Sequence, residues 1–252
     1  MKKNIFISGV SQGIGKEIAL YHLKEGDNVY GISRNSCSEL IAYKNFFHKK
    51  IDLSEFETIS LYLDSFEELK NIRNIDTLYL NAGLIKDINN ISEVSIKDFH
   101  YTMSVNLYSY KVILDYFLNN SFFKLHQIVI SSSIAGVRAR AGMTDYAISK
   151  AALNMMIKLY ALEHPSLFFN VIGLCVFDSN VSRTFSSKNP KIKKFPDLDK
   201  LSIRLKEENY VVTAKKRAYQ LINVLKNSKI LGLESGKFVE IRDLLTKIEK
   251  EN

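Results

Sequence analysis

Residues 4–23 read NIFISGVSQGIGKEIALYHL, and they carry the clearest indication of this chain's fold. Asn4–Ser8 is apolar and β-branched, as expected of a buried parallel strand. A glycine turn follows, and the apolar residues after it recur at the spacing of a helix that packs on a sheet. Because glycine permits close backbone approach and a helix N-terminus offers free N–H groups to an anion, these features together predict a diphosphate site.

The glycines of this turn are spaced G-x-x-x-G-x-G, whereas the more common dinucleotide fingerprint is G-x-G-x-x-G. A glycine turn can also be no more than a tight turn, so its meaning depends on the rest of the chain. The residues expected to contact a dinucleotide here are Gly9, Ser11, Gln12, Gly13, Ile14 and Gly15.

A second motif lies far downstream and carries acid–base chemistry. Tyr146 and Lys150 are four residues apart, so they share one face of a helix. An ammonium beside a phenol favours the phenolate, so we expect Lys150 to lower the pKa of Tyr146 toward neutrality and make it a general acid or base. Ser133 ends an apolar run and could hold the oxygen that receives the proton.

The two motifs, in this order, resemble the short-chain dehydrogenase/reductase family, and the resemblance covers nearly the whole chain. Further matches are the adenine-contacting pair Asp52-Leu53, the element Asn81-Ala82-Gly83 after the fourth strand, the catalytic Asn at Asn106, and Ser133 thirteen residues before Tyr146. The resemblance implies that Tyr146 exchanges a proton with the substrate oxygen and Ser133 positions that oxygen. It implies that Lys150 binds the nicotinamide ribose and Asn106 helps to hold a water. Tyr146 and Lys150 are therefore also expected cofactor contacts.

The expected fold is one α/β domain over residues 1–252, a doubly wound Rossmann domain with helices on both faces. Its sheet is expected to be parallel and seven-stranded, in the order 3-2-1-4-5-6-7. The expected strands are 4–8, 28–33, 46–53, 75–80, 125–132, 167–175 and 235–241. The main expected helices are 16–23, 54–71, 95–119, 145–164 and 213–225.

The end of the second strand bears on the choice of cofactor. An acid there would accept hydrogen bonds from a free ribose 2′-hydroxyl and repel a 2′-phosphate. This chain has Ser33 and then Arg34, a small hydroxyl followed by a forked cation. We therefore expect NADP(H) rather than NAD(H), with Asn35 close by. Gln12 stands where many NADP-preferring relatives have a basic residue, and Arg34 can also be read as an ordinary surface charge.

Residues 179–209 are expected to form a lid over the substrate, because the family has a mobile loop after the sixth strand. Lysines between 188 and 194 could meet an anionic substrate or only keep the loop soluble. The family's Pro-Gly turn before this segment is missing, and Val176-Phe177 stands in its place. That turn normally lies beside the nicotinamide, so the pocket is expected to be reshaped, with Asn180 or Ser182 in place of a Thr. Leu80 also replaces the first Asn of the usual Asn-Asn-Ala-Gly.

Composition limits the remaining classes. The net charge is +8 and the pI about 9.2, which suits an anionic cofactor or substrate, or only a lysine-rich surface. No nucleic-acid-binding motif is present, and no apolar run is long enough to predict a membrane span. Cys37 and Cys175 are too few for a disulfide framework or a metal site, and the start of the chain does not resemble a signal peptide, so we expect a cytoplasmic protein without a metal.

The expected activity is reduction of a carbonyl, or oxidation of the alcohol, with NADP(H). An activated sugar or related anionic metabolite, a 3-oxoacyl chain on an acidic carrier protein and a small nonpolar ketone all remain possible substrates. The sugar predicts a polar pocket under the lid, and the carrier predicts a basic patch at the entrance. A non-catalytic NADP-binding sensor or scaffold is the alternative from another class, although the intact catalytic residues argue against it. Relatives commonly form homodimers or homotetramers.

Overall fold

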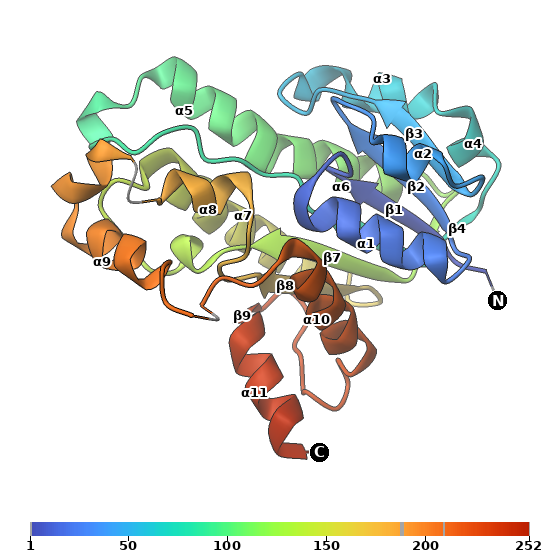
Figure 1. The fold of residues 1–252 in the computed structure, drawn as a ribbon. Coiled ribbons are helices and arrows are strands. Elements are labelled where there is room, and N and C mark those ends of the chain that lie inside the picture. The colour runs from blue at the N-terminus through green and yellow to red at the C-terminus, as the bar shows by residue number, and fades with distance from the viewer. Residues whose placement is uncertain (1, 187–188, 209, 252) are drawn as a thin grey trace.

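The computed structural model describes residues 2–186, 189–208 and 210–251. A seven-stranded parallel sheet forms its centre, in the order β3-β2-β1-β5-β7-β8-β9 (Figure 1). Two further strands of two residues each, β4 (Asn74–Ile75) and β6 (Lys124–Leu125), pair with each other. The predicted order 3-2-1-4-5-6-7 is therefore confirmed. The seven strands are β1 (Asn4–Ser8), β2 (Asn28–Ser33), β3 (Phe46–Lys50), β5 (Thr77–Leu80), β7 (Gln127–Ser132), β8 (Phe168–Gly173) and β9 (Phe238–Glu240).

Helices cover both faces of the sheet, as predicted. One face packs against α3 (Ile59–Asp64), α4 (Glu67–Lys70), α6 (Ser109–Asn119) and α7 (Thr144–Glu163). The other face packs against α1 (Gly13–Lys24), α2 (Ser38–Ile41), α10 (Ala214–Lys226) and α11 (Ile241–Glu251). Side chains of β1 divide between the two layers, because alternate residues of a strand point to opposite faces: Phe6 joins the first core, and Ile5 and Ile7 join the second.

The long helix expected over 95–119 is interrupted. It consists of α5 (Ile96–Met103), the π-helical segment η3 (Ser104–Tyr108) and α6. The π-turns coincide with Asn106, whose buried side chain bonds to another segment of the chain, and π-segments often accompany functional sites. The helix expected over 54–71 is likewise divided into η1 (Phe56–Thr58), α3 and α4.

The ends of the chain's strands and its last helix also differ from expectation. The third strand stops at Lys50 rather than residue 53, and the last strand covers three residues before α11 begins. Helix α11 was not predicted, because its apolar residues form only one narrow face. That face, with Ile241 and Leu244, is buried against the second core.

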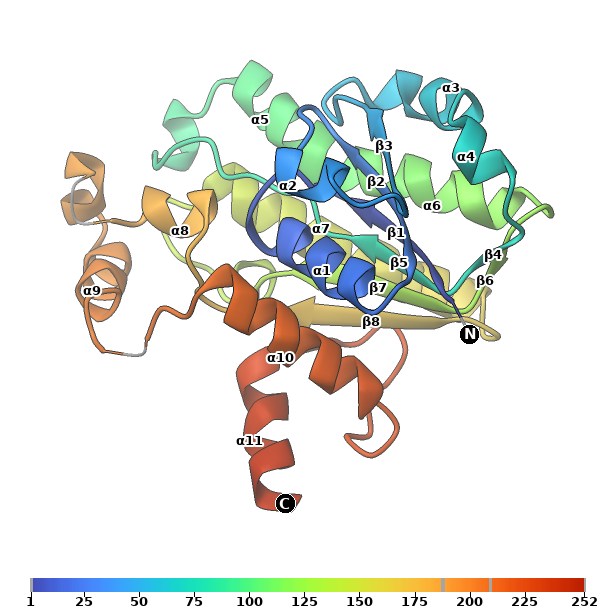
Figure 2. The same cartoon turned by 45° about the vertical axis from the view of Figure 1, so that its right-hand side comes forward.

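Three short helices follow β8 and lie beyond the carboxyl ends of the strands: α8 (Asn180–Thr184), η5 (Pro190–Lys194) and α9 (Pro196–Arg204) (Figure 2). They form most of the expected lid segment, while Lys188 and the lid's last residue, Asn209, lie outside the described residues. No helix in the described part of the chain is long and apolar enough to cross a bilayer.

Candidate active site

The glycine turn has the close packing that a dinucleotide site requires. Gly9 and Gly13 have φ of 82° and 60°, values that side-chain-bearing residues rarely adopt. A Cβ on Gly15 would stand 2.2 Å from the Gly9 carbonyl oxygen and 2.7 Å from the Asn81 side-chain nitrogen. Only glycine fits there. Because Gly15 has no side chain, the first turn of α1 can pack directly against the glycine turn. This backbone cradle fits the diphosphate of a nicotinamide dinucleotide.

The element Asn81-Ala82-Gly83 is fixed to its neighbours by side chains that the sequence did not single out. The Ser8 hydroxyl at the end of β1 accepts hydrogen bonds from the Asn81 and Ala82 N–H groups at 3.0 and 3.3 Å. The Tyr110 hydroxyl donates to the Ala82 carbonyl at 2.6 Å. Two layers of the fold thus hold the chain as it leaves β5.

Ser133, Tyr146 and Lys150 are brought together by β7, η4 (Ile134–Gly136) and α7. The Ser133 side chain hydrogen-bonds to the Tyr146 phenol, and its oxygen also accepts from the Ala135 N–H at 3.2 Å. Lys150 lies one helical turn after Tyr146, is 3% exposed, and donates from Nζ to the Ser131 carbonyl at 2.9 Å. The three side chains predicted from sequence therefore form one cluster at the carboxyl edge of the sheet.

The pKa of Tyr146 differs from the expectation based on sequence. Burial raises the pKa of this phenol, and the hydrogen bond with Ser133 opposes that rise only in part. Burial lowers the pKa of Lys150 to about 8. The expected lowering by the Lys150 ammonium is wrong for this structure, because the Lys150 Nζ bonds to the Ser131 carbonyl and both groups are shielded from water. Tyr146 is consequently protonated at neutral pH, as a proton donor must be.

Gly136 sets the distance between η4 and the helix of Tyr146 and Lys150. A Cβ at Gly136 would lie 2.6 Å from the carbonyl carbon of Lys150. The short helix after Ser133 can therefore pack directly on the backbone of α7. The run of small residues after β7 was the available signal, but it did not by itself reveal this contact.

Asn106 is fully buried and its side-chain atoms are engaged. Its Oδ1 accepts from the Leu84 N–H at 2.9 Å, and its Nδ2 donates to the Leu84 carbonyl at 2.8 Å and to the Ser149 hydroxyl at 3.0 Å. The side chain thus joins the exit of β5 to α7.

The expected ribose and adenine contacts lie at the ends of β2 and β3. Ser33 is buried, donates to the Asn35 carbonyl at 2.7 Å, and lies 2.9 Å from His48 Nε2. Arg34 is exposed and donates to the Tyr101 hydroxyl at 3.3 Å. Asp52 accepts from the backbone and hydroxyl of Ser54, while Leu53 is buried in the core. Arg34 is thus free to turn toward a ligand, whereas Ser33 is not.

The lid segment packs around Tyr146 through an apolar cluster. Tyr146, which is 7% exposed, belongs to a buried group with residues of the 85–88 loop, the start of α7 and the lid. The buried apolar members are Ile85, Ile88, Ala135, Met143, Phe185, Ile192, Phe195, Leu198 and Leu201. The walls on the Tyr146 side of the lid are therefore apolar.

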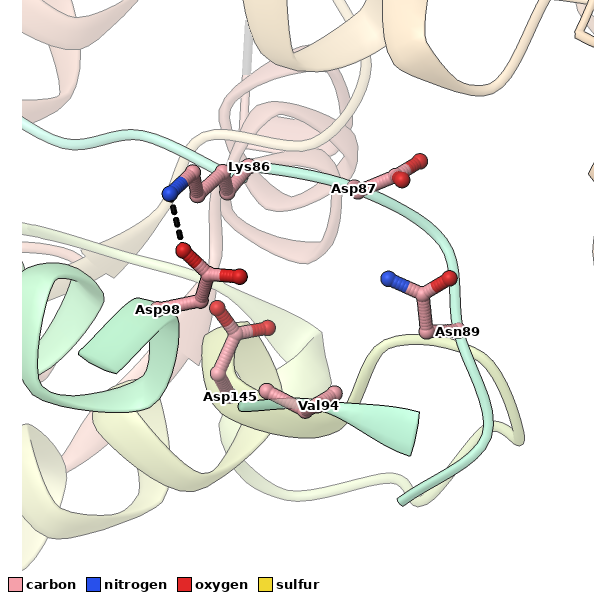
Figure 3. A pocket seen from close by; sticks show the side chains of 6 residues that line it. All are labelled: Lys86, Asp87, Asn89, Val94, Asp98 and Asp145. Atoms are coloured by element: carbon pink, nitrogen blue, oxygen red, sulfur yellow. Dashed lines mark hydrogen bonds and ion pairs between the residues drawn. The ribbon is translucent and has the colours of Figure 1, made fainter. Parts of the chain in front are cut away.

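A polar pocket of about 230 Å³ lies on the other side of the 85–88 loop (Figure 3). It is lined by Lys86, Asp87, Asn89, Val94, Asp98 and Asp145. The buried Asp145 carboxylate accepts a hydrogen bond from the Thr102 hydroxyl at 2.5 Å. Ile85 and Ile88 face the apolar cluster while their neighbours face this pocket. The loop therefore separates the packed apolar cluster from the polar pocket.

Lys191 ties the lid to this same loop. Its ammonium pairs with Asp87 and donates to the Asn89 side chain at 2.8 Å. Partial burial raises the pKa of Asp87, but the contacts with Lys191 and the Ile88 N–H outweigh this and hold the pKa below its usual range. Lys193 and Lys194 are exposed.

Residues 175–182, where this chain lacks the family's Pro-Gly turn, are held by backbone contacts to Val212 and by a helix cap. Cys175 has φ of 54°, the Phe177 backbone bridges to Val212, and the Asp178 N–H donates to the Val212 carbonyl at 2.9 Å. Ser179 and Ser182 together cap the N-terminus of α8. The Ser182 hydroxyl is engaged in this cap, because it donates to the Ser179 carbonyl.

Among the described residues, no group of three or more His, Cys, Asp or Glu side chains is arranged to hold a metal ion.

The fold, the glycine turn and the cluster at the carboxyl edge define an oxidoreductase that uses a nicotinamide dinucleotide. The sequence profile of the short chain dehydrogenases matches residues 3–189, and the chain belongs to this family, whose members act on carbonyl and alcohol groups.

Known relatives and structures agree with this assignment. The chain is 25% identical over 256 residues to a benzil reductase ((S)-benzoin forming) of Bacillus subtilis, covering 95% of this chain and 98% of the relative. It is 27% identical over 193 residues to a 3-oxoacyl-[acyl-carrier-protein] reductase of Buchnera aphidicola, covering 73% and 78%. A short chain dehydrogenase family protein from Francisella tularensis has the same fold, with a TM-score of 0.78, 22% identity and coverage of 96% and 97%.

Proposed function

We propose that this chain is an NADP(H)-dependent reductase of apolar ketones, in which Tyr146 donates the proton to the carbonyl oxygen. The observation that carries the proposal is the buried cluster of Ser133, Tyr146 and Lys150 beneath an apolar lid. The dinucleotide supplies the hydride. Burial raises the pKa of Tyr146, so the phenol is protonated at neutral pH and can donate as the carbonyl is reduced. Ser133, which hydrogen-bonds to this phenol, would orient the same oxygen.

The lining of the lid favours a nonpolar substrate over an activated sugar. A sugar ring would need hydrogen-bonding partners, and unpaired polar groups in an apolar site are costly. Polar side chains do gather nearby, but they line the pocket beyond the 85–88 loop. The relative that reduces benzil, a molecule with two apolar aromatic rings, agrees with this choice.

A carrier-bound 3-oxoacyl chain is the second candidate, and one observation favours it. Lys193 and Lys194 are exposed on the lid, where they could contact an acidic carrier protein. An acyl chain would also suit the apolar walls. Replacing both lysines with Glu would raise KM for the carrier-bound substrate and leave KM for a free ketone unchanged, which separates the two candidates.

The test of the chemistry is Tyr146→Phe, assayed with benzil and NADPH by the loss of nicotinamide absorbance. We expect the rate to fall by about a hundredfold or more, since proton transfer by a positioned side chain contributes about 10² to 10⁴. NADPH binding, followed by fluorescence, should remain. Tyr160→Phe removes a hydroxyl from the same helix and should leave the rate unchanged. Normal turnover by Tyr146→Phe would refute the mechanism.

We further propose a cytoplasmic homodimer or homotetramer. The exposed apolar residues along α7 support association. Cys37 and Cys175 are both free thiols, which agrees with a reducing cytoplasm. Residues 179–209 are proposed to act as the substrate lid, supported by their packing over Tyr146.

A further inference from the structure

One buried arginine below the end of β8 has most of its donors unpaired. Arg217, in the first turn of α10, is 2% exposed, and its Nε and Nη1 have no hydrogen-bond partner. Its Nη2 donates to the Val176 carbonyl over a long 3.4 Å. No carboxylate among the described side chains forms an ion pair with it. A buried cation without a partner is costly, so the site calls for an anion.

A second cation, Arg242, lies close enough to Arg217 to affect its charge. Burial lowers the pKa of Arg217, Cys175 raises it, and the like charge of Arg242 lowers it. Arg242 itself packs on the Tyr210 ring and donates to the Tyr210 carbonyl at 3.5 Å. Two cations thus lie close to the backbone that follows β8.

The topology brings this arginine to the same edge as the glycine turn. Helices α1 and α10 each connect parallel strands, so both run back from the carboxyl edge and both N-termini lie at that edge. The two helices lie side by side (Figures 1 and 2), and the rings of Tyr21 and Tyr219 meet with centroids 5.3 Å apart. The two helices therefore run parallel, and both begin at the carboxyl edge of the sheet.

The backbone that covers Arg217 is the segment that departs from the family pattern. Cys175 is the non-glycine residue with positive φ in the described chain, and the Val176 carbonyl that follows it is the contact of Arg217. The corresponding segment of the family lies beside the nicotinamide.

We propose that Arg217 is an additional anion-binding residue of the cofactor site, and that it takes the nicotinamide-side phosphate of the dinucleotide. A guanidinium offers two parallel donors to phosphate oxygens, and the adjacent helix N-termini favour the same charge. The proposal rests on the dinucleotide binding in the proposed function, but not on the preference for NADP(H), because NAD(H) and NADP(H) share this phosphate.

The test compares ligands with and without the second phosphate. Arg217→Met removes the charge and keeps the length of the side chain, and Arg217→Lys keeps the charge without the fork. Arg73→Met, at the amino end of the sheet, gives the same change in net charge as a control. NADH and NADPH binding is measured by fluorescence titration, adenosine monophosphate binding by calorimetry, and stability without ligand by thermal unfolding.

We expect Arg217→Met to weaken NADH and NADPH binding by about tenfold or more, and Arg217→Lys to weaken both by less. Binding of adenosine monophosphate and the behaviour of Arg73→Met should match the wild type. Unchanged NADH affinity in Arg217→Met would overturn the proposal, as would an equal loss for adenosine monophosphate, which would indicate general distortion. If Arg217→Met does not fold, Arg217→Lys decides, and wild-type NADH affinity in that variant overturns the proposal. A wild type that binds NADH and NADPH equally would refute only the proposed preference for NADP(H) and would leave the proposed role of Arg217 standing.

Discussion

At the scale of single residues, burial dominates the chemistry of the site. It raises the pKa of Tyr146 and lowers that of Lys150, since in each case the neutral form is easier to bury than the charged one. The two shifts move the pair toward neutrality instead of toward a phenolate and an ammonium. The protonated phenol, which burial favours here, is the form that can donate a proton.

Lys150 is expected to reduce the stability of the ligand-free protein at neutral pH. Its pKa falls from 10.5 to about 8, so the unfolded chain binds more protons between these values and the cost of the buried charge is largest below pH 8. Lys150→Met should therefore raise the free energy of unfolding at pH 7 by about 3 kcal/mol. In urea titrations this advantage over wild type should shrink as the pH rises from 8 toward 10.5. An advantage that is independent of pH would contradict the assignment.

Arg34 is expected to select for the 2′-phosphate. Arg34→Ala should weaken NADPH binding by about tenfold, because charge-assisted hydrogen bonds to phosphate contribute about 1.5–3 kcal/mol, and should change NADH binding little. The same fluorescence titrations measure both ligands, with Arg73→Ala as the control for net charge. An equal loss for both dinucleotides would remove Arg34 from the ribose site.

At the scale of elements, the site depends on contacts between segments far apart in the sequence. Asn106 joins the exit of β5 to α7, and Gly136 lets η4 rest on the backbone of α7 at Lys150. The lid adds an apolar cover and one ion pair to the loop below it. Ser133 and Tyr146 are thus carried by elements that pack directly on one another.

Lys191 is expected to stabilise the closed lid. Lys191→Met removes its contacts to Asp87 and Asn89 and should raise KM for an apolar ketone by up to about fivefold, since an exposed ion pair contributes about 0.2–1 kcal/mol. NADPH affinity should not change. Lys193→Met, an exposed lysine of the same short helix, is the control. If steady-state kinetics give the same KM for Lys191→Met and Lys193→Met, the ion pair does not hold the lid.

At the scale of the whole molecule, the carboxyl edge of the sheet gathers the functional groups. The glycine turn, the ends of β2 and β5, the cluster on α7 and the lid all lie there, since every strand of the parallel sheet ends on the same side.

The solvent-facing surface of α7 carries a row of exposed apolar residues: Ile148, Met155, Leu159 and Leu162. Their spacing places them on one face of the helix.

This row on α7 is expected to be covered by a second copy of the chain. The double variant Met155→Glu with Leu159→Glu should convert the oligomer to a monomer, because a charge at the centre of an apolar interface is left without water or a partner. Light scattering after gel filtration measures the mass, and circular dichroism checks that the variant folds. A wild type that is monomeric at micromolar concentration would refute the association.

The sequence by itself determined the family, the strand order and the identity of the clustered Ser133, Tyr146 and Lys150. The family and the clustered residues follow from local signals, namely apolar strands, a glycine turn and a helical spacing of four. The strand order follows from the family that these signals indicate. Only the tertiary structure decided the protonation of Tyr146, the apolar wall below the lid, the break in the helix at Asn106 and the unpaired Arg217. Each of these depends on which distant side chains and backbone groups exclude water from a residue, and that is set by packing between elements rather than by the order of residues along the chain.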